Sequence, residues 1–262
     1  MTAGRRRSSN PAVRAEPRAI GTARARDPLA REVKLLGALL GQVIVEQAGP
    51  ILFGKVEAIR RRTIALRATD DLEIRSRLGI ELAAEFEALA VDDAEAVIRA
   101  FALYFQLVNV AEERARVRGI RGRRRSARGA VTRGSVGEAI LRLAAGGTDP
   151  DELLARLSIE PVLTAHPTEA RRRTALIALR RIERLVERLH DLHLTPEEDG
   201  DIRRRLREEI TLLWQTADLR GEAPSPLDEV RSALAFFDAT LFTAVPRLYR
   251  SVDAALDLLS PP

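Results

Sequence analysis

The chain has 262 residues, enough for one large domain or two small ones, and its formal net charge is +5. It contains no cysteine, which excludes a disulfide framework and a thiolate nucleophile. No run of eighteen or more apolar residues occurs, and no apolar stretch follows the arginine-rich amino terminus. We therefore expect neither a membrane-spanning helix nor a secretory signal, and we expect a cytoplasmic protein.

The positive charge is concentrated in two segments. Residues 1–26 hold seven arginines and one acid, residues 114–133 hold nine arginines and no acid, and the remainder is net acidic. The first segment mixes Arg, Ser, Pro and Gly, so we predict a disordered basic tail over residues 1–27. The second interrupts the helical pattern and predicts an Arg/Gly-rich loop over residues 114–133. Since no aromatic residues are interleaved with these arginines, a nucleic-acid partner is not expected, although binding of a polyanion or nucleic acid by the arginine loops remains an alternative.

Residues 28–113 are predicted to form a helical region. Apolar side chains recur at helical spacing directly after Asp27-Pro28, and Gly49-Pro50 separates this first helix from a second. A third helix, over residues 94–111, is apolar on most of its faces, which is typical of a buried helix. The apolar positions of the three helices include Val33, Leu36, Leu40, Val43, Ile44, Leu52, Val56, Ile59, Val97, Ile98, Phe101, Leu103, Phe105, Leu107 and Val108.

Residues 134–262 begin with two short helices and one strand. Ser135, followed by Glu138 three positions later, predicts a capped helix start, and Asp149-Pro150 predicts a second start. The β-branched and apolar run at 159–165 then predicts a short buried strand. The class expected for the whole chain is mainly α, with this one strand.

Three longer helices follow the strand. They are predicted from about Thr168, from Thr195 and after Pro226, and each carries an apolar stripe at helical spacing. Trp214 belongs to the second of these stripes, so we expect it in the core. The stripes consist of Leu176, Leu179, Ile182, Val186 and Leu189; of Ile202, Leu206, Ile210, Leu213 and Trp214; and of Val230, Leu234, Phe237, Leu241 and Leu248.

The chemistry is expected where the strand meets the first long helix. His166 stands at the end of the strand, and a helix amino terminus offers unpaired backbone N–H groups that suit an anion. Thr168 suits a helix cap and Glu169 suits the first turn, whereas the arginines at 171–173 are unfavourable there unless an anion compensates them. A hydrogen-bonded structural histidine and a solvated arginine face are the plain alternatives.

The residues of this segment resemble a known family. Thr164-Ala165-His166-Pro167-Thr168-Glu169, followed after two residues by Arg172-Arg173-Thr174, closely resembles the amino-terminal active-site signature of phosphoenolpyruvate carboxylases. Three further stretches agree in order with that family: residues 27–62, the Arg-Ala-Phe to Asn-x-Ala-Glu segment at 99–112, and the Leu-Trp-Gln-Thr to Pro-x-Pro-x-Asp-Glu segment at 213–229.

The resemblance implies an activity and a site. Enzymes of this family join phosphoenolpyruvate and bicarbonate to give oxaloacetate and phosphate, with Mg²⁺ or Mn²⁺, and they are typically homotetramers. The histidine matching His166 is implied to accept a proton at the carboxyphosphate step, which an imidazole can do near neutral pH. Arg172 and Arg173 are implied to help fix the anionic site through charge and proximity.

The resemblance also implies that most of the catalytic machinery lies elsewhere. The family has helices packed around an α/β barrel, and its metal-binding carboxylates and glycine-rich arginine loop follow further along, so residues 134–262 match only the start of the barrel region. We expect no metal ligands in this chain, which looks like an amino-terminal fragment that is inactive alone. A non-catalytic helical assembly partner is an alternative from another class.

His190 and His193 are the remaining histidines, and they lie three residues apart beside Asp191. Two histidines and an acid can bind a metal. The preferred interpretation is that they lie at a helix carboxyl end, where a cation is favourable.

Overall fold

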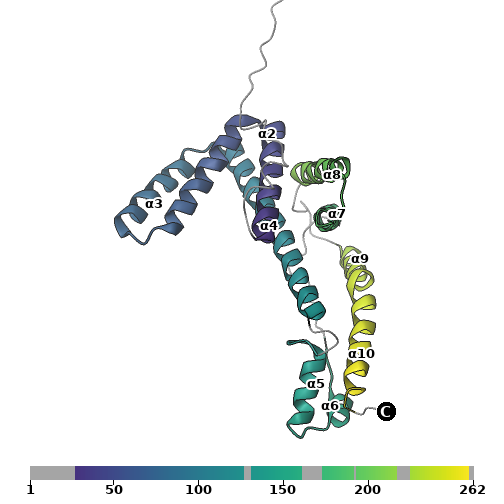
Figure 1. The fold of residues 1–262 in the computed structure, drawn as a ribbon. Coiled ribbons are helices and arrows are strands. Elements are labelled where there is room, and N and C mark those ends of the chain that lie inside the picture. The colour runs from purple at the N-terminus through teal and green to yellow at the C-terminus, as the bar shows by residue number, and fades with distance from the viewer. Residues whose placement is uncertain (1–26, 127–130, 161–172, 192, 217–224, 260–262) are drawn as a thin grey trace, which may run out of the picture. The chain divides into compact units, whose positions relative to one another are not determined.

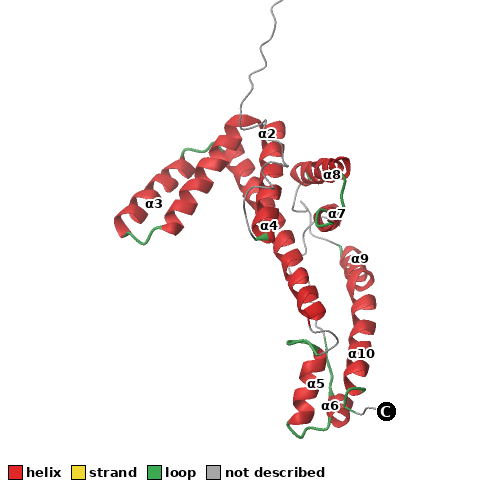
Figure 2. Ribbon diagram, viewed as in Figure 1, coloured by secondary structure: helices red, strands yellow, loops and turns green. Residues whose placement is uncertain are grey.

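The computed structural model describes residues 27–126, 131–160, 173–191, 193–216 and 225–259 (Figure 1). Every regular element among them is a helix (Figure 2), so the prediction of a mainly α chain is confirmed. The predicted basic tail and most of the predicted strand lie outside the described residues. The helices are α2 Pro28–Ala68, α3 Leu72–Glu87, α4 Val91–Ser126, α5 Val136–Ala145, α6 Pro150–Arg156, α7 Arg173–Arg188, α8 Pro196–Gln215, α9 Pro226–Phe236, the π-helix η2 Phe237–Leu241 and α10 Phe242–Leu256.

The chain divides into two compact units. The first unit comprises Met1–Arg116 and Arg172–Asp218, and the second comprises Val117–Arg171 and Leu219–Pro262. Among the described helices, α2, α3, α7, α8 and most of α4 belong to the first unit, and α5, α6, α9, η2 and α10 belong to the second.

Helix α2 begins and bends where the sequence predicts. The Asp27 carboxylate accepts a hydrogen bond from the Leu29 N–H at 3.0 Å, and Pro28 occupies the first turn, where its missing N–H costs nothing. At Gly49 the backbone has φ 89°, a conformation that glycine adopts without a steric penalty. Gly49-Pro50 therefore separates two helical halves, as predicted.

The core of the first unit is built from α2, α4, α7 and α8. Helix α7 packs against α8, and α2 packs against α8 and α3. The predicted stripes supply most of the buried side chains, and Trp214 is buried as expected. The core contains Leu35, Leu36, Leu39, Leu40, Val43, Ile44, Leu52, Val56, Ile59, Val97, Ala100, Leu103, Leu107, Ala111, Ala175, Ala178, Ile182, Val186, Ile202, Leu206, Ile210, Leu213 and Trp214.

Helix α4 corrects two predictions. It is not buried all round, because Ile98 and Phe105 are exposed on the face away from the core. It also continues through Ser126, so the prediction of a loop is wrong for residues 114–126. Arginine is a good helix former, and the basic last turn is favourable beside the negative end of the helix dipole. The glycines within this stretch cost about 1 kcal/mol each, which this helix tolerates.

Helices α2 and α4 are also long and apolar enough, by length and composition alone, to cross a membrane. This differs from the sequence-based expectation of no membrane-spanning helix, which rested on the absence of a long uninterrupted apolar run. Core helices of soluble proteins meet the same criteria, and α2 and α4 both supply side chains to the buried core of the first unit.

The second unit has two buried apolar residues among those described, Ile140 on α5 and Ala255 on α10. Helices α5 and α10 pack against each other. The predicted cap of α5 is confirmed, because Ser135 Oγ accepts a hydrogen bond from the Glu138 N–H at 3.1 Å. Good local signals therefore start these helices, although little apolar surface is buried between them.

Candidate functional site

Two of the predicted site residues, His166 and Arg172, lie outside the described residues. Arg173 is the first residue of α7, and its side chain also lies outside them. The structure therefore describes the helix that directly follows the motif, and the contacts that fix this helix in the first unit.

One face of α7 packs into the core from its first turns onward. Ala175 and Ala178 are buried near the beginning of the helix, and Ile182 and Val186 continue the same face. Helix α8 covers α7. The separation of packed helices depends on the side chains at the contact, and alanines permit close packing at the end of α7 nearest the motif.

A buried arginine joins α4 to α7. The side chain of Arg114 is 7% exposed; its Nη2 lies 2.7 Å from Glu187 Oε1 and its Nη1 lies 3.6 Å from Glu183 Oε1. Glu183 and Glu187 are four residues apart, so they lie on one face of α7. Arg114 Nε is buried without a hydrogen-bond partner. The guanidinium is buried, whereas the two carboxylates are partly exposed, so it is Arg114 that would be costly to leave without these partners. These contacts therefore help to fix where α4 meets α7.

A second polar contact lies just beyond the carboxyl end of α7, near the Arg114 pairs. The ring Nε2 of His190 contacts Glu32 Oε1 on α2. The backbone N–H of His190 donates to the Glu187 carbonyl at 3.2 Å. Glu32 is buried, so this contact satisfies a carboxylate that would otherwise be costly. His193 is exposed, and its backbone N–H donates to Asp191 Oδ1 at 3.0 Å. Across the described residues, no group of three or more His, Asp or Glu side chains is arranged to hold a metal ion.

Helix α8 brings two family-like segments together. It starts with a complete capping box, in which Thr195 and Glu198 satisfy each other's backbone N–H groups. Near its end, Trp214 lies against α4, where the Arg99 guanidinium stands 5.8 Å from the centre of the indole ring. The Arg-Ala-Phe stretch and the Leu-Trp-Gln-Thr stretch therefore meet through a cation–π contact.

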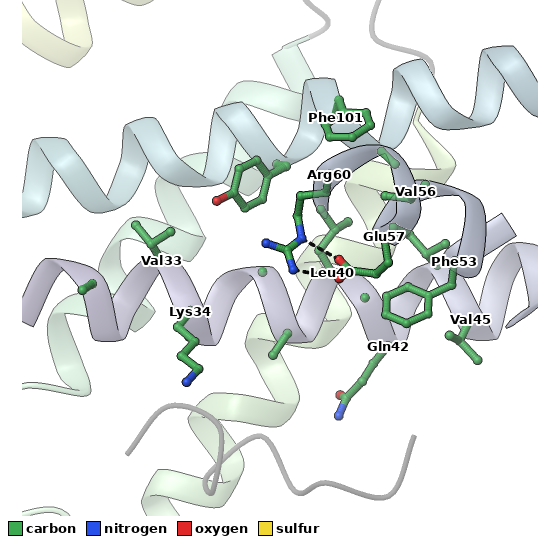
Figure 3. Close-up of a pocket in the computed structure, with 17 residues that line it drawn as sticks. Val33, Lys34, Leu40, Gln42, Val45, Phe53, Val56, Glu57, Arg60 and Phe101 are labelled. Atoms are coloured by element: carbon green, nitrogen blue, oxygen red, sulfur yellow. Dashed lines mark hydrogen bonds and ion pairs between the residues drawn. The ribbon is translucent and has the colours of Figure 1, made fainter. Parts of the chain in front are cut away.

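The first unit also contains a pocket of ≈ 640 Å³ between the two halves of α2 and α4 (Figure 3). Its wall is mainly apolar and includes Phe53, Phe101 and Tyr104. Arg60 donates from Nε and Nη2 to the two carboxylate oxygens of Glu57, each at 2.8 Å, and this pairing raises the pKa of Arg60. The pocket holds none of the predicted site residues.

Two features of this region were missed in the sequence. The pocket requires the kink at Gly49, which brings the second half of α2 back beside the first, and periodicity does not specify that angle. Arg114 was assigned to a loop, although Glu112 and Glu113 directly before it extend the helical pattern of α4 into the basic run.

The comparisons with known proteins agree with the motif. Residues 29–261 match the family described as phosphoenolpyruvate carboxylase. Similar curated proteins of that name come from Roseiflexus castenholzii, 42% identical over 239 residues, and Rhodothermus marinus, 39% identical over 233 residues. These alignments cover 89% and 87% of this chain and 25% and 24% of the relatives. The chain belongs to the phosphoenolpyruvate carboxylase family, and it spans about a quarter of the length of these relatives.

Proposed function

We propose that this chain is the amino-terminal part of a phosphoenolpyruvate carboxylase, which forms oxaloacetate and phosphate from phosphoenolpyruvate and bicarbonate. The family match over residues 29–261 carries the proposal, because it runs through the Thr-Ala-His-Pro-Thr-Glu string as well as the core helices. Further properties proposed by resemblance are a cytoplasmic location, a homotetrameric complete enzyme without membrane attachment, and a role in supplying the tricarboxylic acid cycle.

His166 is the proposed catalytic residue of this chain. Its imidazole would accept the proton released as carboxyphosphate breaks down, since the group titrates near neutral pH. Arg172 and Arg173 would add positive charge beside the phosphorylated substrate. The packing of α7 supports this assignment, because the buried Ala175 and Ala178 hold the amino end of the helix in the core, directly after the motif.

Magnesium or manganese is the proposed metal of the complete enzyme. The described residues do not fit such a site, since no group of three or more possible ligands is found among them. The ligands are proposed to come from the part of the family that this chain does not span. Because its metal ligands would lie in that other part, the isolated chain is proposed to be inactive.

The test supplies the missing part as a separate polypeptide. The chain is produced with the portion of the R. castenholzii relative outside the matched region, and oxaloacetate is measured with Mg²⁺, phosphoenolpyruvate and bicarbonate. We expect activity only when both polypeptides are present, and His166→Asn should lower kcat by about 10²–10⁴-fold, the usual contribution of a general base.

His193→Asn is the matched control, because His193 is exposed and its described hydrogen bond is made by its backbone. Oxaloacetate formation by the isolated chain would contradict the proposed division of the site. Full activity of the paired His166→Asn variant would contradict the proposed role of His166.

A further inference from the structure

The second unit carries a line of exposed apolar side chains along α9, η2 and α10. We name the line the apolar seam. Leu227, Phe242 and Tyr249 are 66%, 68% and 67% exposed, so large apolar surfaces face solvent from the start of α9 to the middle of α10. Scattered exposed apolar residues are ordinary, but a continuous line of them marks an interaction site. The seam consists of the exposed residues Leu227, Val230, Leu234, Phe242, Val245 and Tyr249, with the half-buried Phe237 between its two halves.

The π-helix keeps the seam on one line. In a regular α-helix, Phe242 would lie about 80° around the axis from Leu234, because each residue turns by about 100°. A π-turn takes up one additional residue, so Phe242 follows Leu234 as the seventh residue of an α-helix would, within about 20° of the same line. Across this junction the Phe237 and Phe242 rings are 6.2 Å apart.

Corrected for the extra residue, the seam has the spacing of a helix-packing surface. Leu227, Val230 and Leu234 are separated by three and four residues, and Phe242, Val245 and Tyr249 repeat that spacing. Alternation of three and four residues is the heptad pattern of a narrow seam that packs against another helix. Pro246 lacks the N–H that would bond the Phe242 carbonyl, which is an ordinary cause of an irregular turn at this place.

The seam is distinct from the face that holds the second unit together. Ala255 is buried where α10 packs against α5, and Gly137 of α5 approaches it so closely that an added Cβ would lie 3.7 Å from the Ala255 Cβ. At about 100° per residue, Ala255 lies about 120° around the axis from Tyr249. The seam therefore remains exposed when α5 is packed in place.

We propose that the apolar seam docks an amphipathic helix from the part of a phosphoenolpyruvate carboxylase that this chain does not span. The proposal rests on the proposed function. The relatives are about four times as long as the matched region, so most of their polypeptide lies outside it. Among the residues that the structure describes in the second unit, the buried apolar side chains are Ile140 and Ala255, whereas Leu234, Phe242 and Tyr249 are exposed, so these helices still have apolar surface to bury. A helix from the remaining polypeptide supplies the missing burial.

The experiment measures binding through the seam directly. The probe is the portion of the R. castenholzii enzyme outside the matched region, carrying an affinity tag, and this chain is produced with it at full length. Leu234→Glu and Tyr249→Glu place a charge on the seam at positions already exposed in the isolated chain. Each should weaken co-purification on the order of thirtyfold, the effect of losing one strong interface contact.

Ala254→Glu is the matched control, because Ala254 is exposed and lies about 140° around α10 from Tyr249. It should co-purify as the unchanged chain does, and all three variants should keep the helix content of the unchanged chain by circular dichroism. Seam variants that co-purify undiminished would overturn the proposal, as would an unchanged chain that fails to bind the probe. Seam variants that only convert a self-associated form of this chain into monomers would assign the seam to a second copy instead.

The same preparation separates this inference from the proposed function. Binding that depends on the seam, without oxaloacetate formation, would sustain the docking surface and contradict the proposed activity. Oxaloacetate formation that survives both seam substitutions would support the proposed activity and contradict the docking surface.

Discussion

The two units of this chain have equally well-formed helices and very different cores. Helix α8 of the first unit and α9 of the second each begin with proline in the first turn and a complete capping box. The first unit buries a continuous cluster from four helices, whereas the second buries Ile140 and Ala255 among its described apolar residues. Local sequence therefore starts the helices of both units, and only the packing of distant segments decides which faces are covered.

The largest contrast is expected for truncations of leucine. Leu206 is fully buried on α8, and Leu206→Ala should lower the free energy of unfolding by about 2–5 kcal/mol, because it removes buried surface and leaves a cavity. Leu234→Ala makes the same chemical change on the exposed seam and should change it by less than about 0.5 kcal/mol. Urea unfolding followed by circular dichroism measures both. Equal losses of unfolding free energy in the two variants would contradict the difference in packing between the units.

The next effect concerns the contact between α4 and α7. Arg114→Met keeps much of the buried stem but removes the ion pairs with Glu183 and Glu187, and should destabilise the first unit by about 1–3 kcal/mol. The carboxylates of Glu183 and Glu187 are partly exposed and are hydrated by water in the variant, which limits the loss of stability. Arg116→Met removes an exposed pair with Glu113 and should have no measurable effect. If Arg114→Met left the free energy of unfolding unchanged in the same urea titration, the Arg114 ion pairs would not anchor α7.

The kink in α2 gives a smaller effect with opposite signs at two glycines. Gly49 has φ 89°, so Gly49→Ala should cost about 1–2 kcal/mol, because an L-residue is strained there. Gly54 lies inside the second half of α2 with open space around an added Cβ, so Gly54→Ala should stabilise by about 0.5–1 kcal/mol. Thermal unfolding of the two variants measures the signs, and stabilisation by Gly49→Ala would contradict the kinked conformation.

The smallest expected effect compares the two capping boxes. Thr195→Ala removes the cap of α8, whose formation is coupled to the core, and should cost about 1 kcal/mol of global stability. Ser225→Ala removes the equivalent cap of α9 and should reduce helix content locally, with a smaller change in the midpoint of the main unfolding transition. Equal shifts of that midpoint would indicate that the two units unfold together.

Much of the fold is predictable because its signals are local. Asp27-Pro28, Ser135 with Glu138, Asp149-Pro150 and Thr195-Pro196 each start a helix as expected. The end of α4 was not predictable in this way, because Arg114 is held by glutamates about seventy residues further along the chain. Helix α3 was not predicted; its start is marked only by the Asp71 cap, and none of its residues is buried.

The last stripe shows how a small backbone feature defeats a periodic pattern. Regular α-helical spacing through Val230 and Leu234 leads to Leu241 and Leu248, whereas the π-helix shifts the line to Phe242, Val245 and Tyr249. A regular helical period does not show where a π-turn adds one residue to the helix. The candidate site depended on a different signal, because His166, Arg172 and Arg173 were assigned from a string of residues resembling a family, and that assignment stays a prediction.

Hydrogen exchange resolved along the isolated chain tests the contrast between the units most directly. Backbone amides of α8 should exchange slowly, with the global stability of the first unit, while those of α9 and α10 exchange much faster. Adding the tagged remainder of the R. castenholzii enzyme should slow exchange in α9 and α10 and leave α8 unchanged. Equal protection of α10 and α8 in the isolated chain would contradict the claim that the second unit needs a further segment to cover its seam.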